Sequence, residues 1–338
     1  EAATTGNRRS ASISKFLWLS DLHLDPFYGT LDAAGQPGAY CAQENAPHEG
    51  QLGCDTPLQL LNETLQQAAK DDAMKSSLTF VVVTGDMCRH QTDQLDQPVE
   101  TTKEILSRVS HLLRETLGDD VSIVPSLGNN DVTPDYYLDV QDPSELLSMA
   151  AEGLGVLFES DLERETFLQG GYFARNVSAT ITALSLNTLL YSTSHLPDDI
   201  DEEDPLGQFA WLEDQLAMAL YTDRMVYIIG HIPPAMGSYR HSQLWQEPFL
   251  RRYYSILQHH DYIFVIAGEF FGHLHSDEFR FIVSPPTIIE TDDSSSEAAT
   301  SANISDDLSK TESLHWWPML LASSVSPMYG SNPSYRFV

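Results

Sequence analysis

Short apolar runs alternate with longer amphipathic stretches along most of this chain, and this alternation limits its possible folds more than any other feature. The run LTFVVVT at 78–84 is largely apolar and rich in β-branched residues, which predicts a strand covered on both faces. Further strands are expected at 16–20, 121–127, 179–186, 225–230 and 262–267. Helical spacing is found at 57–70, 99–117, 207–221 and 248–258. This order of strands and helices predicts a layered α/β fold.

The length and hydrophobic content of the chain are those of an ordinary globular protein. It has 338 residues, enough for one large or two modest domains, and 42% of them are hydrophobic. We expect an N-terminal tail at 1–13 and a single domain over 14–338. The segment 284–312 is rich in Ser, Thr, Asp, Glu and Ala, which predicts a flexible acidic insertion on the surface. No apolar run is long enough to span a bilayer, so no transmembrane segment is expected.

The chain is strongly acidic. It has 18 basic and 49 acidic residues, a formal net charge of −31. This charge argues against binding to nucleic acid, which requires a basic face. It suits an acidic or extracellular compartment, where some carboxylates are neutralised; a solvated acidic surface without further meaning is the alternative. The first residue is Glu1 rather than Met, so we expect a processed or trimmed start.

Cysteines and glycosylation sequons favour the secretory pathway, with a vacuolar, lysosomal or extracellular destination. Cys41 and Cys54 lie in one Gly/Pro-rich loop and could close it as a disulfide. The third cysteine, Cys88, would then have no disulfide partner. Each Asn-x-Ser/Thr triplet is a weak signal alone, but together with the cysteine pair they support this compartment. The expected N-glycan sites are Asn62, Asn176 and Asn303.

Polar side chains collect directly after the predicted strands. Taken alone, each fragment has a plainer interpretation, because Asp-x-His and Gly-Asp are common in turns and caps. In open α/β sheets, however, ligands bind beyond the carboxyl ends of the strands. We therefore expect two Asp, one Asn and four His at one rim of the sheet. The fragments are Asp21-x-His23, Gly85-Asp86, Gly128-Asn129, Gly230-His231 and Gly272-His273-x-His275.

These residue types predict a site for two metal ions. In an extended segment the rings of His273 and His275 would point to one side. Imidazole, carboxylate and amide ligands without thiolates suit Zn²⁺ first, with Mn, Fe, Co and Mg as further candidates. Seven ligands are too many for one tetrahedral ion but fit two ions that share a carboxylate. Two ions about 3.5–4 Å apart can stabilise an in-line displacement at phosphorus by a metal-bound hydroxide, which indicates phosphoester hydrolysis.

The five fragments resemble the motifs of the calcineurin-like metallophosphoesterases, and the resemblance covers nearly the whole chain. It implies a sandwich of two mixed β-sheets flanked by helices, with 14–338 as a single catalytic domain. Finer features resemble the acid-sphingomyelinase-like branch: 25–28 (DPFY), 53–57 (GCDTP), 231–234 (HIPP), 270–279 (FFGHLHSDEF) and 324–336 (SVSPMYGSNPSYR). Within that branch the stretches 84–90 (TGDMCRH), 125–132 (PSLGNNDV) and 184–189 (LSLNTL) look most like endopolyphosphatases.

The resemblance implies a role for each candidate residue. Asp86 would bridge the two ions, and Asp131 would orient its neighbours from behind the ligands. One ion would be bound by Asp21, His23 and His275, and the other by Asn129, His231 and His273.

Asn130 departs from the family pattern. Most relatives have His at this place, which is taken to protonate the leaving oxygen, and an amide cannot do so. Either the chain is a weakened relative, or its leaving group needs little protonation, as a phosphate leaving from a phosphoanhydride does. Endopolyphosphatases resemble this chain in having Asn there, which favours the second interpretation. His90 matches another site histidine of the branch and could act as an acid or bind phosphate. Arg89 beside it could contact phosphate or be solvated.

Three classes of function remain open from the sequence. The leading one is endopolyphosphatase-like hydrolysis of phosphoanhydride or phosphodiester bonds. The net charge of −31 counts against a polyanionic substrate. Two divalent cations and His90 would nevertheless make the entrance to the site positive. The alternative enzyme is an acid-sphingomyelinase-like phosphodiesterase acting on sphingomyelin or nucleotides. A second class is a metal-binding relative that has lost its acid, with Asn130 as its support. A purely structural metal domain fits poorly, because structural sites usually close with Cys and His.

Overall fold

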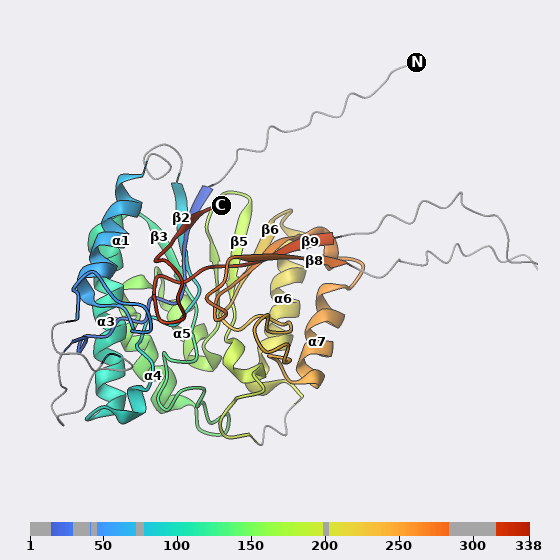
Figure 1. Cartoon of the computed structure of the whole chain (residues 1–338). Helices are drawn as coiled ribbons and strands as arrows, with labels where there is room; N and C mark the ends of the chain where they lie inside the picture. Colours follow the sequence, from blue (N-terminus) through green and yellow to red (C-terminus); the bar gives the residue numbers. More distant parts are fainter. Residues whose placement is uncertain (1–14, 30–40, 42–45, 72–77, 199–202, 284–315) are drawn as a thin grey trace, which may run out of the picture.

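The computed structural model describes residues 15–29, 41, 46–71, 78–198, 203–283 and 316–338. Two mixed β-sheets lie at the centre of the molecule, and helices cover their outer faces (Figure 1). This is the α/β sandwich predicted from the sequence. The N-terminal tail at 1–13, the insertion at 284–312 and the sequon at Asn303 lie outside the described residues.

The first sheet has four strands in the order β10-β1-β2-β3. Strands β1, β2 and β3 are parallel, and β10 adds to the edge of β1 in the antiparallel direction. The pairing of β10 with β1 brings the two ends of the described chain together, as Figure 1 shows. The strands are β1 (Lys15–Leu19), β2 (Leu78–Val83), β3 (Ser122–Pro125) and β10 (Arg336–Phe337).

The second sheet has six strands in the order β4-β5-β6-β7-β9-β8. Its four central strands are parallel, and β4 and β8 close the two edges in the antiparallel direction. The strands are β4 (Phe173–Asn176), β5 (Ile181–Ser185), β6 (Met225–Ile229), β7 (Ile266–Phe271), β8 (Glu278–Val283) and β9 (Trp316–Leu321).

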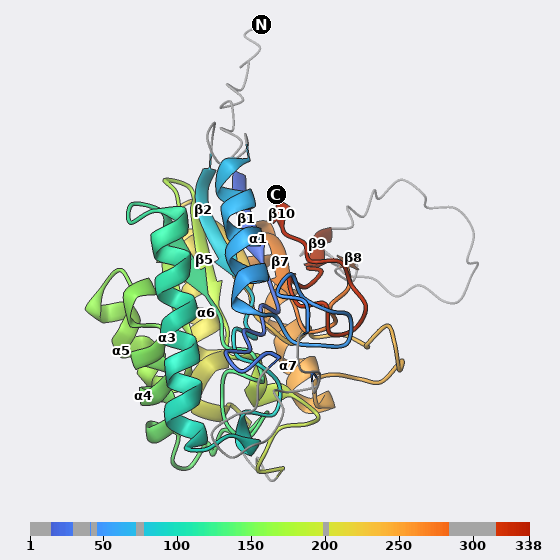
Figure 2. The ribbon, with the colours of Figure 1, turned by 60° about the vertical axis from the view of Figure 1, so that its left-hand side comes forward.

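Helices flank the two sheets on opposite sides. The first group lies beside the four-stranded sheet, with α1 and α3 in the foreground of Figure 2, and the second lies beside the six-stranded sheet (Figures 1 and 2). The first group is α1 (Leu58–Lys70), α3 (Pro98–Leu117) and α4 (Ser144–Gly153), and α5 (Asp161–Gly170) packs against α4 and the edge strand β4 of the second sheet. The second is α6 (Gln208–Tyr221) and α7 (Glu247–Leu257). Within the described residues no helix is both long and apolar enough to cross a membrane.

Aromatic side chains join the two sheets. Phe16 of β1 stacks on Phe80 of β2, with ring centroids 4.8 Å apart, and meets Phe270 of β7 edge-on at 5.1 Å. Trp18 meets the same Phe270 ring at 5.3 Å. All four rings are almost fully buried, so β1 and β7 are fixed relative to one another by a large apolar contact. This matters for function because both strands carry candidate ligands at their carboxyl ends.

One predicted strand is partly wrong. The segment 262–267 was expected to be extended, but Tyr262–Phe264 form a short 3₁₀ turn and β7 begins at Ile266. The Tyr262 N–H donates to His259 O, which continues the turn that ends α7. The apolar run at 262–264 could not show this turn. Strands β4, β8, β9 and β10 and helices α4 and α5 were not predicted.

Candidate metal centre and active site

The seven candidate ligands lie together at the carboxyl ends of the strands. Asp21 and His23 follow β1, Asp86 follows β2 and Asn129 follows β3. His231 follows β6, and His273 and His275 follow β7. Six of the seven are buried, and His273 is partly buried. The two sheets thus deliver ligands from both sides to one buried centre, as the alternation of strands and polar fragments predicted.

One group of ligand atoms comes from Asp21, His23 and His275, here called the Asp21 cluster. His275 Nε2 lies 3.2 Å from Asp21 Oδ1 and 3.2 Å from His23 Nε2. His23 Nε2 lies 3.9 Å from Asp21 Oδ1 and 3.5 Å from Asp86 Oδ2. The three side chains therefore converge on one point, with the carboxylate of Asp86 at its edge.

The second group comes from Asn129, His231 and His273, here called the Asn129 cluster. His231 Nε2 lies 3.0 Å from Asn129 Oδ1 and 3.3 Å from His273 Nδ1. The same nitrogen lies 3.2 Å from Asp86 Oδ2. One oxygen of Asp86 thus faces both clusters, which is the position a bridging carboxylate requires.

These distances fit metal coordination. Ligands about 2.0–2.1 Å from a tetrahedral ion lie about 3.4 Å from one another. His23 Nε2 and His275 Nε2 lie at nearly this separation, 3.2 Å apart. The donor set of nitrogen and oxygen without thiolate suits Zn²⁺, Mn²⁺ or Fe. The residues present therefore fit two divalent ions, one in each cluster.

Hydrogen bonds behind the rings fix which nitrogen faces each centre. His23 Nδ1 lies 2.9 Å from Cys88 O, and His231 Nδ1 lies 2.7 Å from Thr84 O. A carbonyl accepts only from a protonated nitrogen, so Nδ1–H donates and Nε2 keeps its lone pair for an ion. This arrangement is characteristic of metal-binding histidines.

The pair His273 and His275 is not extended, so the prediction that both rings point to one side is wrong. Both residues have left-handed backbones, with φ of 69° and 53°. The rings therefore diverge, and His273 joins the Asn129 cluster while His275 joins the Asp21 cluster. Asp21, His23 and Asp86 also have positive φ. Such conformations are unfavourable for residues other than glycine, and their concentration here marks a functional site.

Two glycines allow the loops to approach this closely. A Cβ on Gly128 would overlap the backbone nitrogen and Oδ1 of Asp86. A Cβ on Gly272 would overlap Ser20 and the carboxylate of Asp21. The glycines of these two motifs are thus required by contact with the neighbouring ligand rather than by turn geometry alone.

Asp131 braces the loops behind the ligands and does not face the clusters. Its Oδ1 accepts from the N–H groups of Met87 and Cys88 at 2.7 and 3.0 Å, and its Oδ2 from Gly128 at 2.8 Å. Burial, with Asp86 nearby, raises the pKa of Asp131 to about 6. These contacts agree with the orienting role that the sequence suggested.

The pKa values of the candidate ligands are shifted in different directions by burial and by neighbouring charges. Without bound ions, burial lowers the pKa of a histidine, but the carboxylates of Asp86 and Asp21 outweigh it and raise the pKa of His231 to about 9. Burial and the neighbouring cation of His231 lower the pKa of His273 to about 3. Burial and His90 lower that of His23 to about 4. Burial would raise the pKa of Asp86, but His231 and His23 hold it well below its usual value.

His90 lies against the Asp21 cluster. Its ring stacks on His23 with centroids 4.1 Å apart, and one ring nitrogen of each of His23, His90 and His275 lies within 4.8 Å of the others. Its Nδ1 lies 2.8 Å from Asp55 Oδ1, a residue that was not predicted. Burial opposes a positive charge on His90, but Asp55 outweighs it and raises the pKa of His90.

Arg89 does not face the clusters. It is 2% exposed, and its guanidinium donates to Asp25 Oδ1 at 3.2 Å and to His90 O at 3.1 Å. The structure therefore supports neither a contact with phosphate nor a solvated side chain for this residue. Its role is to hold the loop that carries His90.

Two tyrosines line the approach to the centre. Tyr329 is 66% exposed, and its ring lies edge-on to His275 at 4.8 Å and to His90 at 5.9 Å. Tyr136 lies edge-on to His273 at 6.2 Å. One aromatic side chain thus stands beside each cluster.

The fold and the site define a metallophosphoesterase. Residues 14–277 match the family model of the calcineurin-like phosphoesterases, and the chain belongs to this family.

Curated relatives of two kinds are similar to this chain. The chain is 31% identical over 287 residues to sphingomyelinase phosphodiesterase D of Dictyostelium discoideum, covering 85% of this chain and 57% of the relative. It is 32% identical to human acid sphingomyelinase-like phosphodiesterase 3b, covering 80% and 59%. It is 30% identical to an endopolyphosphatase of Neurospora crassa, covering 78% and 37%. The chain therefore spans about a third to three fifths of the length of these relatives.

Among solved structures, a dimetal phosphatase from Danio rerio has the same fold. It superposes with a TM-score of 0.52 at 12% identity, covering 96% of this chain and 92% of that one. At this identity the likeness concerns the fold alone. It agrees with the arrangement of two mixed sheets between helices described above.

Proposed function

We propose that this chain is a dimetal-dependent hydrolase that cleaves phosphoanhydride bonds in the manner of an endopolyphosphatase. The Asp21 cluster and the Asn129 cluster would each hold one divalent ion, and Asp86 would bridge them. When bound, the ions supply an acidified water and positive charge that stabilises the transition state at phosphorus. Zn²⁺ is the first candidate, and Mn, Fe, Co or Mg could replace it.

The observation that carries this proposal is the side chain of Asn130. Its Nδ2–H donates to Asp86 Oδ2 at 2.7 Å, and its backbone N–H donates to Asp86 Oδ1 at 2.8 Å. Asn130 is thus bound to the bridging carboxylate and cannot deliver a proton to a leaving group. A phosphate leaving group is a much weaker base than an alkoxide and needs less protonation. A phosphoanhydride substrate therefore agrees with this site better than an alkyl phosphodiester.

His90 is the residue we propose to contact the substrate beside the ions. Its ring stacks on His23 of the Asp21 cluster, and its Nδ1 lies beside Asp55. Proton donation from this position is geometrically reasonable and replaces what Asn130 cannot supply. Asp131 would act only by orienting the loops that carry Asp86 and Asn129.

A phosphodiesterase of the acid-sphingomyelinase-like type is the second candidate. Relatives of this kind cover most of the chain at 31% and 32% identity. The exposed ring of Tyr329 beside His275 offers an apolar surface to a substrate with a lipid or a base, which polyphosphate lacks. Polyphosphate as the substrate is supported by the similarity of this chain to the endopolyphosphatases of Neurospora crassa and Debaryomyces hansenii, to which it is 30% and 31% identical.

We place the protein in the secretory pathway, with a vacuolar, lysosomal or extracellular destination. A disulfide between Cys41 and Cys54 supports this placement, because such bonds persist in oxidising compartments. Asn62 on α1 is partly exposed and Asn176 at the end of β4 is exposed, so both could carry N-glycans.

A cleavage assay with four substrates tests the proposal. Long-chain polyphosphate, an aryl phosphodiester, ATP and sphingomyelin are compared at pH ~5 and ~7, with and without a chelator. We expect chelator-sensitive shortening of polyphosphate. Cleavage of sphingomyelin or the aryl diester with intact polyphosphate would establish the second candidate instead. No turnover of any substrate by protein with two bound ions would show a metal-binding relative that has lost catalysis.

A further inference from the structure

Four buried side chains form a chain of hydrogen bonds that ends on a candidate metal ligand. Trp18 Nε1 lies 3.0 Å from Thr84 Oγ1, and Thr84 Oγ1 lies 2.7 Å from Ser20 Oγ. Ser20 Oγ in turn is hydrogen-bonded to Asp21 Oδ2. We propose that Ser20 and Thr84 are positioning residues, which orient the carboxylate of Asp21 toward the ion of the Asp21 cluster. This inference rests on the dimetal centre of the proposed function and is independent of the substrate.

The two ends of this hydrogen-bond chain fix its direction. An indole N–H can only donate, and an ionised carboxylate can only accept. Trp18 therefore donates to Thr84, Thr84 donates to Ser20, and Ser20 donates to Asp21. The carbonyl of Leu19, 3.5 Å from Thr84 Oγ1, is a more distant acceptor for the same hydroxyl. All four side chains of the chain are 0% exposed, so bulk water does not compete for these donors.

The hydrogen bond from Ser20 makes the two oxygens of Asp21 unequal. Oδ2 accepts from Ser20, whereas Oδ1 lies 3.2 Å from His275 Nε2 in the Asp21 cluster. The backbone N–H of His273 lies 3.1 and 3.2 Å from the two oxygens and limits rotation of the carboxylate further. A carboxylate that is held at one oxygen presents the other oxygen to an ion in one orientation. Hydrogen-bond partners behind a metal ligand typically change metal affinity about 10- to 100-fold.

The backbone of Ser20 and Asp21 is fixed on two sides. Asp21 N–H donates to Gly85 O at 3.1 Å. Val325 N–H donates to Ser20 O, and Ser326 N–H donates to Asp21 O, both at 3.1 Å. Because the backbone is held in this way, the hydroxyl of Ser20 stays within reach of the carboxylate.

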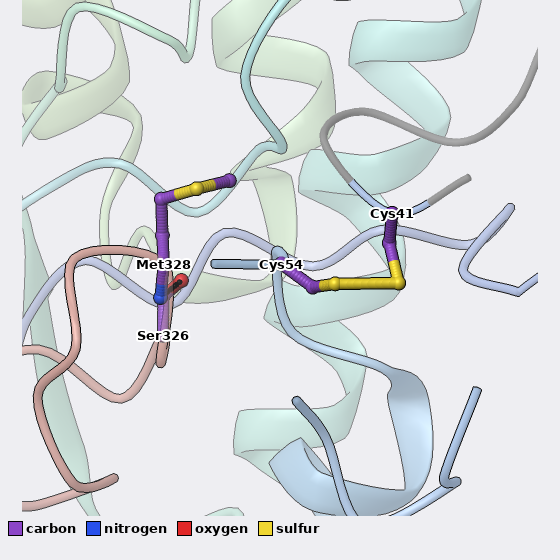
Figure 3. The surroundings of a disulfide bond; sticks show 4 residues. All are labelled: Cys41, Cys54, Ser326 and Met328. Carbon is purple, nitrogen blue, oxygen red and sulfur yellow. Dashed lines mark hydrogen bonds between the residues drawn. A yellow bond between two sulfur atoms is a disulfide. The ribbon is translucent and has the colours of Figure 1, made fainter. Parts of the chain in front are cut away.

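The turn that supports this backbone is attached to the disulfide loop. Figure 3 shows the turn that carries Ser326 and Met328 near the disulfide of Cys54. Gly53 N–H donates to Pro327 O at 3.2 Å, which joins the two segments directly. Such rigid support is what a positioning residue needs.

Thr84 contacts both clusters, but through different atoms. Its carbonyl accepts from His231 Nδ1–H at 2.7 Å, whereas its hydroxyl acts on Asp21 through Ser20. Replacing Thr84 by Val removes the hydroxyl and keeps the carbonyl. The variant therefore separates an effect on the Asp21 cluster from an effect on the Asn129 cluster.

Metal retention tests the inference without any substrate. Protein loaded with Zn²⁺ is dialysed against graded chelator, and the bound ions per chain are counted. We expect Ser20→Ala to weaken the binding of one ion about 10- to 100-fold and to leave the other ion within about twofold. Thr84→Val should weaken the same ion. In the Ser20→Ala background, Thr84→Val should change the affinity less than about twofold, because Thr84 acts through Ser20.

Three further variants identify the ion and control for lost packing. His275→Ala is expected to keep only the ion of the Asn129 cluster, and adding Ser20→Ala should change the affinity of that ion less than about twofold. Thr84→Ser keeps the hydroxyl and should bind both ions as the wild type does. Thr102→Val is the matched control, because it removes a buried hydroxyl that donates to Pro98 O at 2.8 Å within α3.

The outcomes separate this inference from the proposed function. Unchanged affinity in Ser20→Ala, equal weakening of both ions, or a further loss from Thr84→Val in the Ser20→Ala background would overturn the positioning role. A wild type that binds two ions but leaves polyphosphate intact would overturn the proposed substrate, and the affinities would still decide the role of Ser20 and Thr84. A wild type that binds less than one ion per chain would overturn the dimetal centre and this inference together.

The comparison of Thr84→Val with Thr84→Ser decides the question if Ser20→Ala does not fold. Val has nearly the shape of Thr without the hydroxyl, and Ser keeps the hydroxyl without the methyl group. Weaker binding of one ion in Thr84→Val, with normal binding in Thr84→Ser, is expected. Equal affinities in the two variants would overturn the inference.

Discussion

Asn130 binds both carboxylate oxygens of Asp86, through its backbone N–H to Oδ1 at 2.8 Å and its Nδ2–H to Oδ2 at 2.7 Å. Asp86 Oδ2 is also the atom that faces His23 and His231, at 3.5 and 3.2 Å. The amide therefore orients, by hydrogen bonds, the one carboxylate that faces both clusters. Asn130 departs from the family pattern, but it is more than the absence of an acid, because it holds the carboxylate of Asp86 in place.

Replacing Asn130 by Ala should weaken the metal centre. The variant removes the side-chain donor that orients Asp86 Oδ2 in a buried site, so we expect metal affinity or turnover to fall about 10- to 100-fold. Metal content after dialysis against graded chelator, measured beside turnover, gives the two quantities. Asn62→Ala, at a partly exposed position on α1, is the control. Unchanged affinity and turnover in Asn130→Ala would show that this contact has no functional role.

Asp86→Asn should abolish turnover, with a loss of more than about 100-fold. An amide has one oxygen instead of two and no charge, so it cannot bridge two cations or balance the histidines around it. Turnover and bound metal are compared with those of Asp223→Asn, in which an exposed carboxylate undergoes the same change. Full activity of Asp86→Asn would refute the dimetal assignment.

The candidate ligands could be predicted because each one directly follows a strand or its loop. A parallel sheet brings these ends together, so order along the chain was enough to place Asp21, Asp86 and His231 at one rim. The directions of His273 and His275 could not be predicted, because their left-handed backbones depend on contacts with the first sheet. Asp55 precedes His90 by 35 positions in an irregular loop, and no periodic signal connects the two.

The fold was predictable where burial gives a simple pattern. Strands covered on both faces, such as β2 and β3, form apolar runs that can be recognised in the sequence. Strand β8 reverses the usual rule, because Phe279 and Phe281 are exposed while Glu278 and Arg280 are only partly exposed. Strand β4 contains Arg175, which is buried through an ion pair with Glu163. Such elements depend on tertiary partners, so local sequence does not predict them.

Removing metal should remove activity reversibly. Two ions per chain are expected in the holoprotein, and a chelator should reduce turnover to background until Zn²⁺ or Mn²⁺ is restored. His275→Ala should lower the content to about one ion, because it removes a ligand of the Asp21 cluster alone. His111→Ala, at an exposed histidine on α3, serves as the matched control. Elemental analysis that finds less than one ion per wild-type chain would contradict the dimetal centre.

Glu269 lies in the middle of β7, where it is 0% exposed. Its Oε1 accepts from Trp317 Nε1 at 2.7 Å. Burial raises the pKa of this carboxyl from 4.5 to about 8 although Trp317 and Tyr253 stabilise the charged form. The folded protein therefore keeps a proton on Glu269 that the unfolded chain releases at mild pH.

This proton should make the fold more stable in acid. Between pH 4.5 and about 8 the folded state binds the proton and the unfolded state does not, so stability falls as pH rises, by at most about 1.4 kcal/mol per pH unit, and levels off above pH 8. Glu269→Gln keeps an oxygen for Trp317 and cannot ionise. We expect the melting temperature of the wild type to fall between pH 5 and 8 by several degrees more than that of Glu269→Gln, measured with equal metal. Glu115→Gln, at an exposed position of α3, should follow the wild type. Parallel curves for wild type and Glu269→Gln would show that Glu269 does not change its protonation on folding.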